Sequence, residues 1–325
     1  MRSFTDGAVT DGGVALALLI VAALLPAVVS TEYVLLAASM IVTALVAVSF
    51  NLLFGYTGMF SFGQAAFYGL GAYATVLLMN RAGLSFYLAL GGGVGIAVLA
   101  GALSGVVLVR MEPVAFIMLT FALGDLMQFV AEHSPSLTGG DDGLIATRLP
   151  HDLNVVVDAN GVYYPMLAVA TVVLVGVFAF VRSRNGLVLR AIREDALRAR
   201  TLGVAVERRR LGVFTLAAGV AAVGGGLSVL SAQIVYPDVF NWKISANALI
   251  VTLLGGVGRF SGPLVGAVLL GLIDFYVGKL TTDTLLVEGA ILLAVIVLAP
   301  RGVTAVRLRR RSPQASAAAT SAAPS

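Results

Sequence analysis

The 325-residue sequence has no cysteine and only two histidines. Without thiols it has no disulfides and no thiolate metal sites, while the redox compartment stays open. His133 and His151 alone cannot form a histidine-rich metal site, so no metal site is expected. No paired carboxylates, histidine cluster or nucleophile motif stands out either, and an enzyme therefore finds little support.

Charged residues are also scarce. They make up 12% of the sequence, whereas 59% is hydrophobic and the mean hydropathy is +0.98. A soluble globular protein is about 45–50% apolar, and several apolar stretches here approach or exceed the ~20 residues that span a bilayer as a helix. We therefore expect an all-α, polytopic membrane protein. The positive charge lies in loops beside apolar segments, which is a topology signal and does not indicate nucleic-acid binding.

About ten apolar runs are candidates for transmembrane helices. They cover residues 14–30, 34–54, 60–79, 86–109, 113–132, 164–181, 211–232, 245–258, 262–280 and 285–299. The first run follows Asp6 and Asp11 with only Arg2 as positive charge, which suits a retained helix better than a signal peptide. The run at 245–258 is short for a full crossing, so residues 245–280 could span the membrane or re-enter it.

The distribution of charge predicts the orientation. Residues 182–210 hold nine arginines and three acids, and the sequence from Arg301 holds five arginines and no acid. Arginine-rich loops stay in the cytoplasm, so both segments and both termini are expected there. Residues 133–163, in which acidic side chains outnumber basic ones, would form an external loop. Residues 1–311 are then a transmembrane domain with a cytoplasmic loop at 182–210, and 312–325 a disordered cytoplasmic tail.

Two glycine-rich segments interrupt the apolar sequence. Backbone groups freed at membrane depth must face protein or a water-filled cavity. Helix breaks are expected at Gly55, Gly58, Gly63, Gly255, Gly256, Gly258 and Pro263. The glycines could instead allow close helix packing, as small-xxx-small pairs do. The string GGVGRFS lacks the third glycine of GxGxxG and the GK[ST] of a P-loop, so the chain is not expected to be an ATPase.

Polar residues within the apolar runs are candidates for a substrate pathway. Asn51, Ser61 and Gln64 accompany the first glycine cluster. Asp125 and Asp274 are acids within predicted spans, and such groups are functional candidates because burying their charge is costly. Each acid could instead lie near a helix end or hydrogen-bond to a neighbour.

The arginine-rich segment is predicted to form one amphipathic helix over 187–202, preceded by Asn185 and capped at its C-terminal end by Gly203. With about 3.6 residues per helical turn, one face of this helix would hold Val188, Ile192, Ala196, Ala199 and Leu202. Leu197 would lie among the arginines, where it could insert into a groove of a partner. A basic amphipathic helix could alternatively lie flat on lipid headgroups.

Four motifs, spread in order over about two thirds of the chain, resemble the permease subunits of branched-chain amino acid ABC importers, specifically the LivM-type half. They are NLLFGYTGMFSFGQAAFYGLGAY at 51–73, SLTGGDDGL at 136–144, RSRNGLVLRAIREDALRARTLGV at 182–204 and LLGGVGRFSGPLVGA at 253–267. The resemblance implies a type II ABC importer permease fold with broken or re-entrant segments, in a bacterial cytoplasmic (inner) membrane.

The resemblance also implies partners. These are a second homologous permease subunit, two ABC ATPase subunits that bind ATP and Mg, and a periplasmic or lipid-anchored substrate-binding protein, besides membrane lipids. The chain itself would be non-catalytic and hold no cofactor. A coupling helix within 186–203 would contact the ATPases through Gly186, Arg190, Ile192, Arg193, Glu194, Leu197 and Gly203.

The implied substrate pathway combines the polar residues above with a motif in the acidic loop. Thr138, Gly139 and Gly140 match a family motif and would border an external gate, and Asp125 stands where an acid is common in the family. Branched-chain amino acids are the expected substrates. Related permeases serve urea and other small amides, so such an importer is an alternative. A stand-alone ion-coupled secondary transporter that uses Asp125 or Asp274 is another.

Overall fold

A computed structural model describes residues 2–149, 153, 159–280 and 289. The predicted last span at 285–299 and the predicted tail at 312–325 lie outside the described residues. Within them the fold is all-α, as predicted, apart from one pair of two-residue strands.

Long helices occupy each of the first nine predicted spans. They are α1 (Arg2–Leu24), α2 (Thr31–Thr57), α3 (Gln64–Ala82), α4 (Phe86–Leu108), α5 (Pro113–Glu132), α7 (Ala159–Arg182), α10 (Val206–Ala232), α11 (Trp242–Gly255) and α12 (Ser261–Leu280). In the described part of the chain, six of them, α2, α4, α5, α7, α10 and α12, are long and apolar enough to cross a membrane. The chain is thus a multi-pass helical protein, and the total of ten spans stays a prediction.

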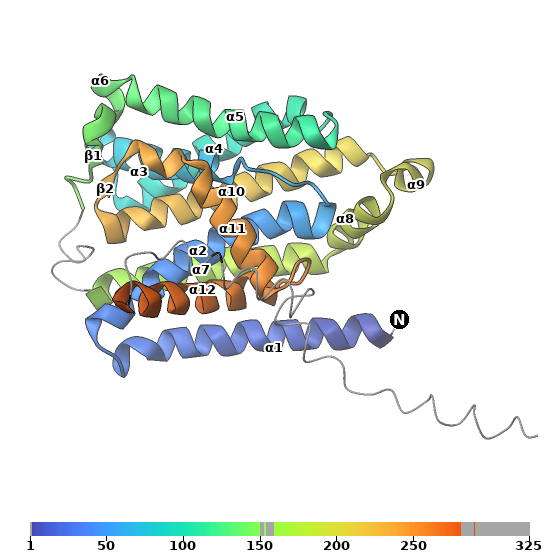
Figure 1. The fold of residues 1–325 in the computed structure, drawn as a ribbon, viewed down its shortest axis with the longest axis horizontal. Coiled ribbons are helices and arrows are strands. Elements are labelled where there is room, and N and C mark those ends of the chain that lie inside the picture. The colour runs from blue at the N-terminus through green and yellow to red at the C-terminus, as the bar shows by residue number, and fades with distance from the viewer. Residues whose placement is uncertain (1, 150–152, 154–158, 281–288, 290–325) are drawn as a thin grey trace, which may run out of the picture.

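Short elements gather at the two ends of the helix bundle. At one end lie α6 (Pro135–Thr138), η2 (Gly140–Asp142), the strands β1 (Leu144–Ile145) and β2 (Ile234–Val235), and η4 (Pro237–Phe240). At the other end α8 (Arg184–Glu194) and α9 (Ala196–Thr201) project beyond the long helices, beside the start of α1 (Figure 1). Near the first end, η1 (Leu25–Ala27) follows α1. The acidic and arginine-rich segments therefore lie on opposite sides of the bundle, as the charge distribution predicts.

Helix α10 forms the centre of the bundle and packs against α2, α3 and α4. In its most apolar stretch of 18 residues, 83% of the residues are buried. Glycines permit this packing: a Cβ on Gly71 of α3 would lie 2.2 Å from the Ala222 carbonyl oxygen, and one on Gly225 would lie 1.9 Å from that of Tyr68. Small residues at these positions let the backbones of α3 and α10 approach closely.

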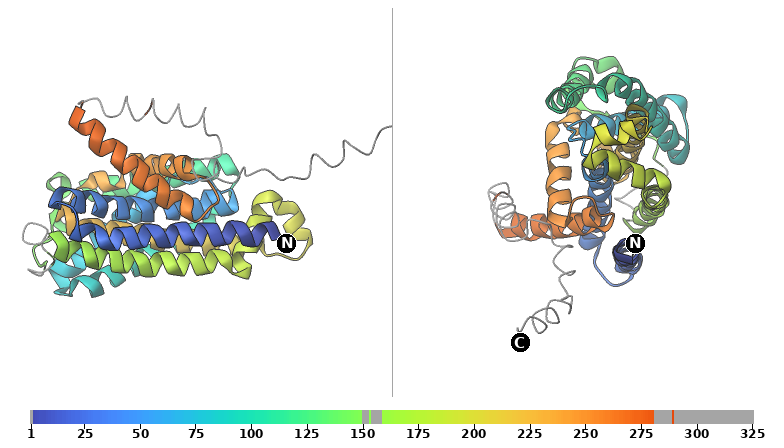
Figure 2. Two further views of the ribbon diagram at one scale, coloured as in Figure 1. Left: turned by 90° about the horizontal axis from the view of Figure 1, so that it is seen from below. Right: turned by 90° about the vertical axis from the view of Figure 1, so that its right-hand side faces the viewer.

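Helices α1 and α5 lie on opposite sides of this centre, as the end-on view in Figure 2 shows. The Tyr163 hydroxyl of α7 donates a hydrogen bond of 2.8 Å to the Ala22 carbonyl and ties α1 to the bundle. Helix α5 leaves Val114, Met118, Leu126 and Phe129 exposed. In a membrane protein such an apolar face meets lipid tails or another protein.

Candidate functional site: the helix breaks and the arginine-rich segment

The first predicted helix break is present between α2 and α3. Helix α2 ends at Thr57, and Gly58 follows with a φ of 74°, a left-handed conformation that favours glycine. The chain is non-helical until α3 begins at Gln64, directly after Gly63. Gly55 does not break the helix, contrary to expectation, because it lies inside α2. A Cβ there would be 2.8 Å from the Gly258 nitrogen, so close packing explains this glycine.

Side chains from α11, from α5 and from the break itself hold the backbone of the first break. The Ser245 hydroxyl of α11 donates to the Phe62 carbonyl at 2.6 Å and accepts from the Ala65 N–H at 2.9 Å. On α5, the Thr120 hydroxyl accepts from the Phe62 N–H at 3.2 Å. The buried Ser61 hydroxyl accepts from the Gly63 N–H at 3.0 Å. Ser61 thus stabilises the turn itself, and its predicted place in the substrate pathway stays a prediction.

The second predicted break joins α11 to α12. Gly256 and Gly258 have φ values of 119° and 78°, so this loop needs glycine at both positions. Gly255 is the last residue of α11 and Pro263 lies in the first turn of α12. Proline is tolerated there because the N–H groups of a first turn have no intrahelical partner. Pro263 therefore begins a helix and does not break one, which corrects the prediction for this residue.

Glycines also bring α11 and α12 into direct contact. A Cβ on Gly255 would lie 1.8 Å from the Gly262 carbonyl oxygen, and a Cβ on Gly266 would lie 2.0 Å from the Val251 carbonyl oxygen. Gly262 and Gly266 form a small-xxx-small pair, and this kind of close packing is the alternative that the sequence allows to a helix break. The structure confirms the packing interpretation for this pair.

Asn51 connects the two breaks. Its Nδ2 donates to the Arg259 carbonyl at 2.8 Å, and its Oδ1 accepts from the Gly258 N–H at 2.9 Å. The side chain is only 2% exposed. The amide of Asn51 satisfies the backbone of the second break, and its predicted place in a substrate pathway stays a prediction. An amide fits here because it offers a donor and an acceptor at once.

Arg193 of α8 reaches the same place. Its Nη1 donates to the Gly55 carbonyl oxygen and lies 2.9 Å from where a Cβ on Gly258 would be. Its Cγ is 3.4 Å from the corresponding position on Gly58. We call Asn51, Gly55, Gly58, Arg193 and Gly258 the glycine junction. In the glycine junction, both helix breaks meet the arginine-rich segment. These regions are far apart in sequence: Asn51 and Gly258 are separated by 207 residues.

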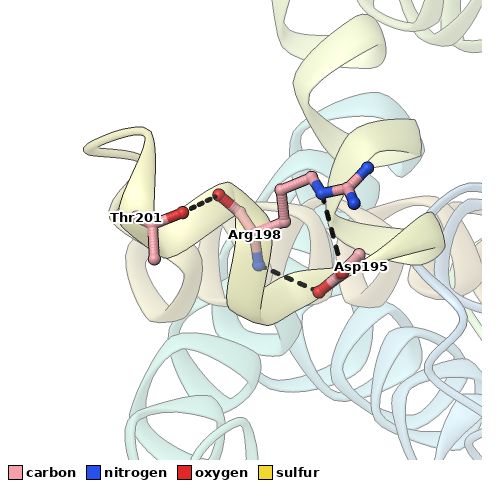
Figure 3. Close-up of polar contacts among 3 residues, drawn as sticks. All are labelled: Asp195, Arg198 and Thr201. Atoms are coloured by element: carbon pink, nitrogen blue, oxygen red, sulfur yellow. Dashed lines mark hydrogen bonds and ion pairs between the residues drawn. The ribbon is translucent and has the colours of Figure 1, made fainter.

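The arginine-rich segment forms two helices where one was predicted. Asp195 has extended backbone angles between α8 and α9, and its carboxylate accepts from the Arg198 N–H at 2.9 Å (Figure 3). Aspartate favours such caps because it binds the backbone locally. At the start of α8 the cap is the Ser183 hydroxyl and not Asn185. Gly203, with a φ of 82°, follows the last helix as predicted.

Most of the arginines in this segment are engaged within the chain. The partners are the Phe178 ring for Arg182, the Tyr56 ring for Arg190, the Gly55 carbonyl for Arg193, Asp195 for Arg198, Glu207 for Arg200 and Asn185 for Arg209. Figure 3 shows the contact of Arg198 with Asp195 and the hydrogen bond from the Thr201 hydroxyl to the Arg198 carbonyl. Half of these contacts hold the segment against α2 and α7, and the others lie within the segment, so the arginines are less free to bind a partner.

Three leucines of the segment face outward. Leu187, Leu197 and Leu202 are 59%, 71% and 79% exposed. The exposure of Leu197 agrees with the sequence, whereas Leu202 was predicted on the buried face. The break at Asp195 explains this error, because it resets the helical phase. Ile192 and Ala199 are buried as predicted.

The remaining coupling candidates occupy different environments. Gly186 is buried where a Cβ would lie 1.8 Å from the Val181 carbonyl oxygen, so it fixes the approach of α8 to the end of α7. Glu194, the last residue of α8, is exposed. The predicted contacts of these residues with an ATPase stay predictions.

The other predicted pathway residues are not brought together. Gln64 is buried at the start of α3, Asp125 is exposed on α5, and Thr138 lies in the acidic loop. There the Thr138 hydroxyl donates to the Ser134 carbonyl at 2.8 Å, while Gly139 and Gly140 have positive φ values of 79° and 61°. These residues shape a turn that leads into the β1–β2 pair. Their role at an external gate stays a prediction.

Two adjoining cavities contain polar residues that the sequence analysis missed. Thr43 of α2 and Asn247 of α11 line both cavities, and Asp274 of α12 lines the larger one. A single threonine or asparagine within an apolar run is a weak signal, because such side chains often bind the backbone of their own helix. Only the acid stood out in the sequence.

Comparison with known proteins identifies the family. Residues 31–300 match the family described as branched-chain amino acid transport system / permease component. The chain belongs to this permease family. The high-affinity branched-chain amino acid transport system permease protein LivM of Salmonella typhimurium is 26% identical, over 92% of this chain and 77% of that protein. LivM of Escherichia coli is 24% identical, over 88% of this chain and 73% of that protein.

A second type of relative covers slightly less of this permease. LivH of Escherichia coli, a permease protein of the same high-affinity transport system, is 26% identical over 80% of this chain and 90% of its own. No solved structure matches the chain. The relatives confirm the resemblance seen in the four motifs and make this chain a membrane permease.

Proposed function

We propose that this chain is one of two permease subunits in an ATP-driven, binding-protein-dependent importer of branched-chain amino acids. The observation that carries the proposal is the connection from the projecting helices α8 and α9 to both helix breaks through Arg193. The names of the relatives, LivM and LivH permease proteins of a high-affinity branched-chain amino acid transport system, support the substrate and the second subunit. ATP and Mg would be held by separate ATPase subunits.

The exposed leucines are the proposed binding site for the ATPases. Leu187, Leu197 and Leu202 project from a part of the chain whose arginines are mostly engaged internally. Apolar side chains that fill pockets dominate the binding energy of many interfaces. When the ATPase pair closes, α8 would move, and Arg193 would carry this movement to the Gly55 carbonyl and the second break. Glycine breaks are suited to absorb such changes in φ and ψ.

The proposed orientation follows from the two ends of the bundle. The end with α8, α9 and the start of α1 would face the cytoplasm of a bacterial inner membrane, because arginine-rich loops stay inside. The acidic turn and the β1–β2 pair would then face the binding protein.

The exposed face of α5 is the proposed contact with the second permease. Asp125 lies on this face among apolar side chains. A carboxylate that faces lipid is costly, so protein contact or a water-filled pathway is expected there. In this arrangement the candidate pathway residue Asp125 would lie at the boundary between the two permeases.

The test uses the chain reconstituted in proteoliposomes with its candidate second permease, ATPases and binding protein. The double variant L197D/L202D should abolish copurification of the ATPases and lower amino acid uptake by about tenfold or more, since a charge would face an apolar pocket. Leu197→Met is the matched control and should retain both properties. Full uptake by the double variant would contradict the proposal. Ion-driven uptake by this chain alone would favour the secondary transporter instead.

A further inference from the structure

Two connected cavities lie between α2, α3, α11 and α12. The larger has a volume of about 280 Å³ and is lined by residues of α2, α11 and α12, including Ser39, Thr43, Asn247 and Asp274. The smaller, about 130 Å³, lies between α2, α3 and α11 and shares Thr43 and Asn247 with the first. Ser39 and Asn247 are exposed, so the larger cavity opens to the surface of this subunit.

Three helices direct polar groups to the larger cavity. Asp274 contributes a carboxyl group, Asn247 an amide and Thr43 a hydroxyl. Among the residues that the structure describes, neither the Thr43 hydroxyl nor the Asn247 amide has a hydrogen-bond partner. Ser39 differs, because its hydroxyl donates to the Leu36 carbonyl at 2.8 Å. A carboxylate beside amide and hydroxyl oxygens suits a ligand with several N–H donors and a positive charge.

The smaller cavity has aliphatic walls beside the polar groups of Thr43, Tyr68 and Asn247. Its walls include the aliphatic side chains of Val42, Val46, Ile244 and Ala248. Water makes poor contacts with such walls, whereas an aliphatic group gains from leaving water. Asn247 stands at the shared wall and offers both a donor and an acceptor. A molecule with an ammonium group, a carboxylate and a short branched hydrocarbon would therefore find a partner for each of these groups in the two cavities.

The position in the fold also favours a transport site. Thr43 lies near the middle of α2, which runs from Thr31 to Thr57 and is long enough to cross the membrane. Asn247 lies on α11, a short helix of 14 residues that ends at the second break. Substrate sites of transporters commonly lie near the bilayer midplane beside interrupted helices.

We propose that the joined cavities bind the amino acid during its passage. The ammonium group would contact Asp274 and Thr43, and the branched side chain would lie in the smaller cavity against the aliphatic side chains of Val46 and Ala248. This inference rests on the proposed function and assigns it a substrate-contacting site within this chain.

The experiment measures uptake of radiolabelled leucine and valine by the complete reconstituted complex. Asp274→Asn removes the charge that would bind the ammonium group and should lower uptake of both by about tenfold, while the ATPases still copurify. Ser104→Ala on α4 is the control outside both cavities and should leave uptake unchanged, because that hydroxyl binds the backbone of its own helix at the Ala100 carbonyl. Ala248→Leu reduces the space of the smaller cavity and should lower leucine uptake about threefold more than valine uptake.

The outcomes separate this inference from the proposed function. If the wild-type complex takes up neither amino acid, the proposed function is overturned. If wild-type uptake is normal but Asp274→Asn, Asn247→Ala and Ala248→Leu all leave it unchanged, only the cavity site is overturned. Should Asp274→Asn fail to assemble, Asn247→Ala and Ala248→Leu decide: reduced uptake and a shifted leucine-to-valine ratio support the site, and unchanged values overturn it.

Discussion

The glycine junction and the joined cavities are built from overlapping helices but use their polar groups in opposite ways. Asn51 in the junction and Thr43 in the cavities lie about two turns apart on α2. In the junction, Asn51 and Arg193 bind backbone groups of other segments. In the cavities, Asn247 and Thr43 face space. One region is therefore suited to transmit movement, and the other to receive a ligand.

Two asparagines illustrate what this difference teaches. Asn51 is almost fully buried and both ends of its amide are bonded, whereas Asn247 is exposed and lines both cavities. A polar residue within a membrane segment is thus not by itself a pathway residue. Burial together with satisfied hydrogen bonds indicates a structural role, as for Asn51.

The largest effect is expected next to the glycine junction, where the backbones of α11 and α12 are in direct contact. Gly255→Ala would place a Cβ 1.8 Å from the Gly262 carbonyl oxygen, a backbone atom that cannot move aside cheaply. The free energy of unfolding of the purified permease in detergent should fall by about 3 kcal/mol. Gly176→Ala on α7, where no atom lies within 4 Å, is the control and should not destabilise. Equal stability of the two variants would argue against close contact of α11 and α12.

The next largest effect on stability is expected when the two asparagines are replaced by leucine. Asn51→Leu leaves the Gly258 N–H and the Arg259 carbonyl without their partner and should destabilise the protein by about 2 kcal/mol. Asn247→Leu, at an exposed position, should change the free energy of unfolding by about 0.5 kcal/mol or less. Unfolding in mixed micelles with increasing SDS measures both. A larger loss for Asn247→Leu would reverse the roles assigned here.

The smallest effect is expected from the arginines. Arg193→Gln weakens the hydrogen bond to the Gly55 carbonyl and should cost about 1 kcal/mol, since the guanidinium is partly exposed. Arg198→Gln removes only an exposed contact with Asp195 at 4.0 Å and should cost less than about 0.5 kcal/mol. The same unfolding assay compares them. If Arg198→Gln proves the more costly, Arg193 does not secure the junction.

The sequence predicted the helices and breaks because these depend on local patterns. Apolar runs placed the long helices, and the left-handed angles at Gly58 and Gly258 explain why glycine clusters marked their interruptions. The Asp195 break was missed although its signal was local, since aspartate readily caps a following helix. Apolar residues recur at helical spacing across 187–202, and this pattern favoured one continuous helix. The prediction therefore put Leu202 on the apolar face, whereas it is exposed.

The junction itself could not be predicted. Arg193 and the Gly55 carbonyl are 138 residues apart, and Asn51 and Gly258 are 207 residues apart. No periodicity or motif relates such positions; only the packing of α2, α8 and α11 brings them together. The same holds for the cavities, whose polar residues come from separate helices and become a site only through their arrangement.

The antiparallel pair of β1 and β2 has a consequence for biogenesis. Leu144 pairs with Val235 and Ile145 with Ile234, so this small ladder closes a chain segment on the order of 90 residues. During synthesis the first strand leaves the ribosome before α7 and α10, and the second only after them. The ladder can therefore form only once α7 and α10 have been inserted with the correct topology, which makes it a late checkpoint of membrane insertion.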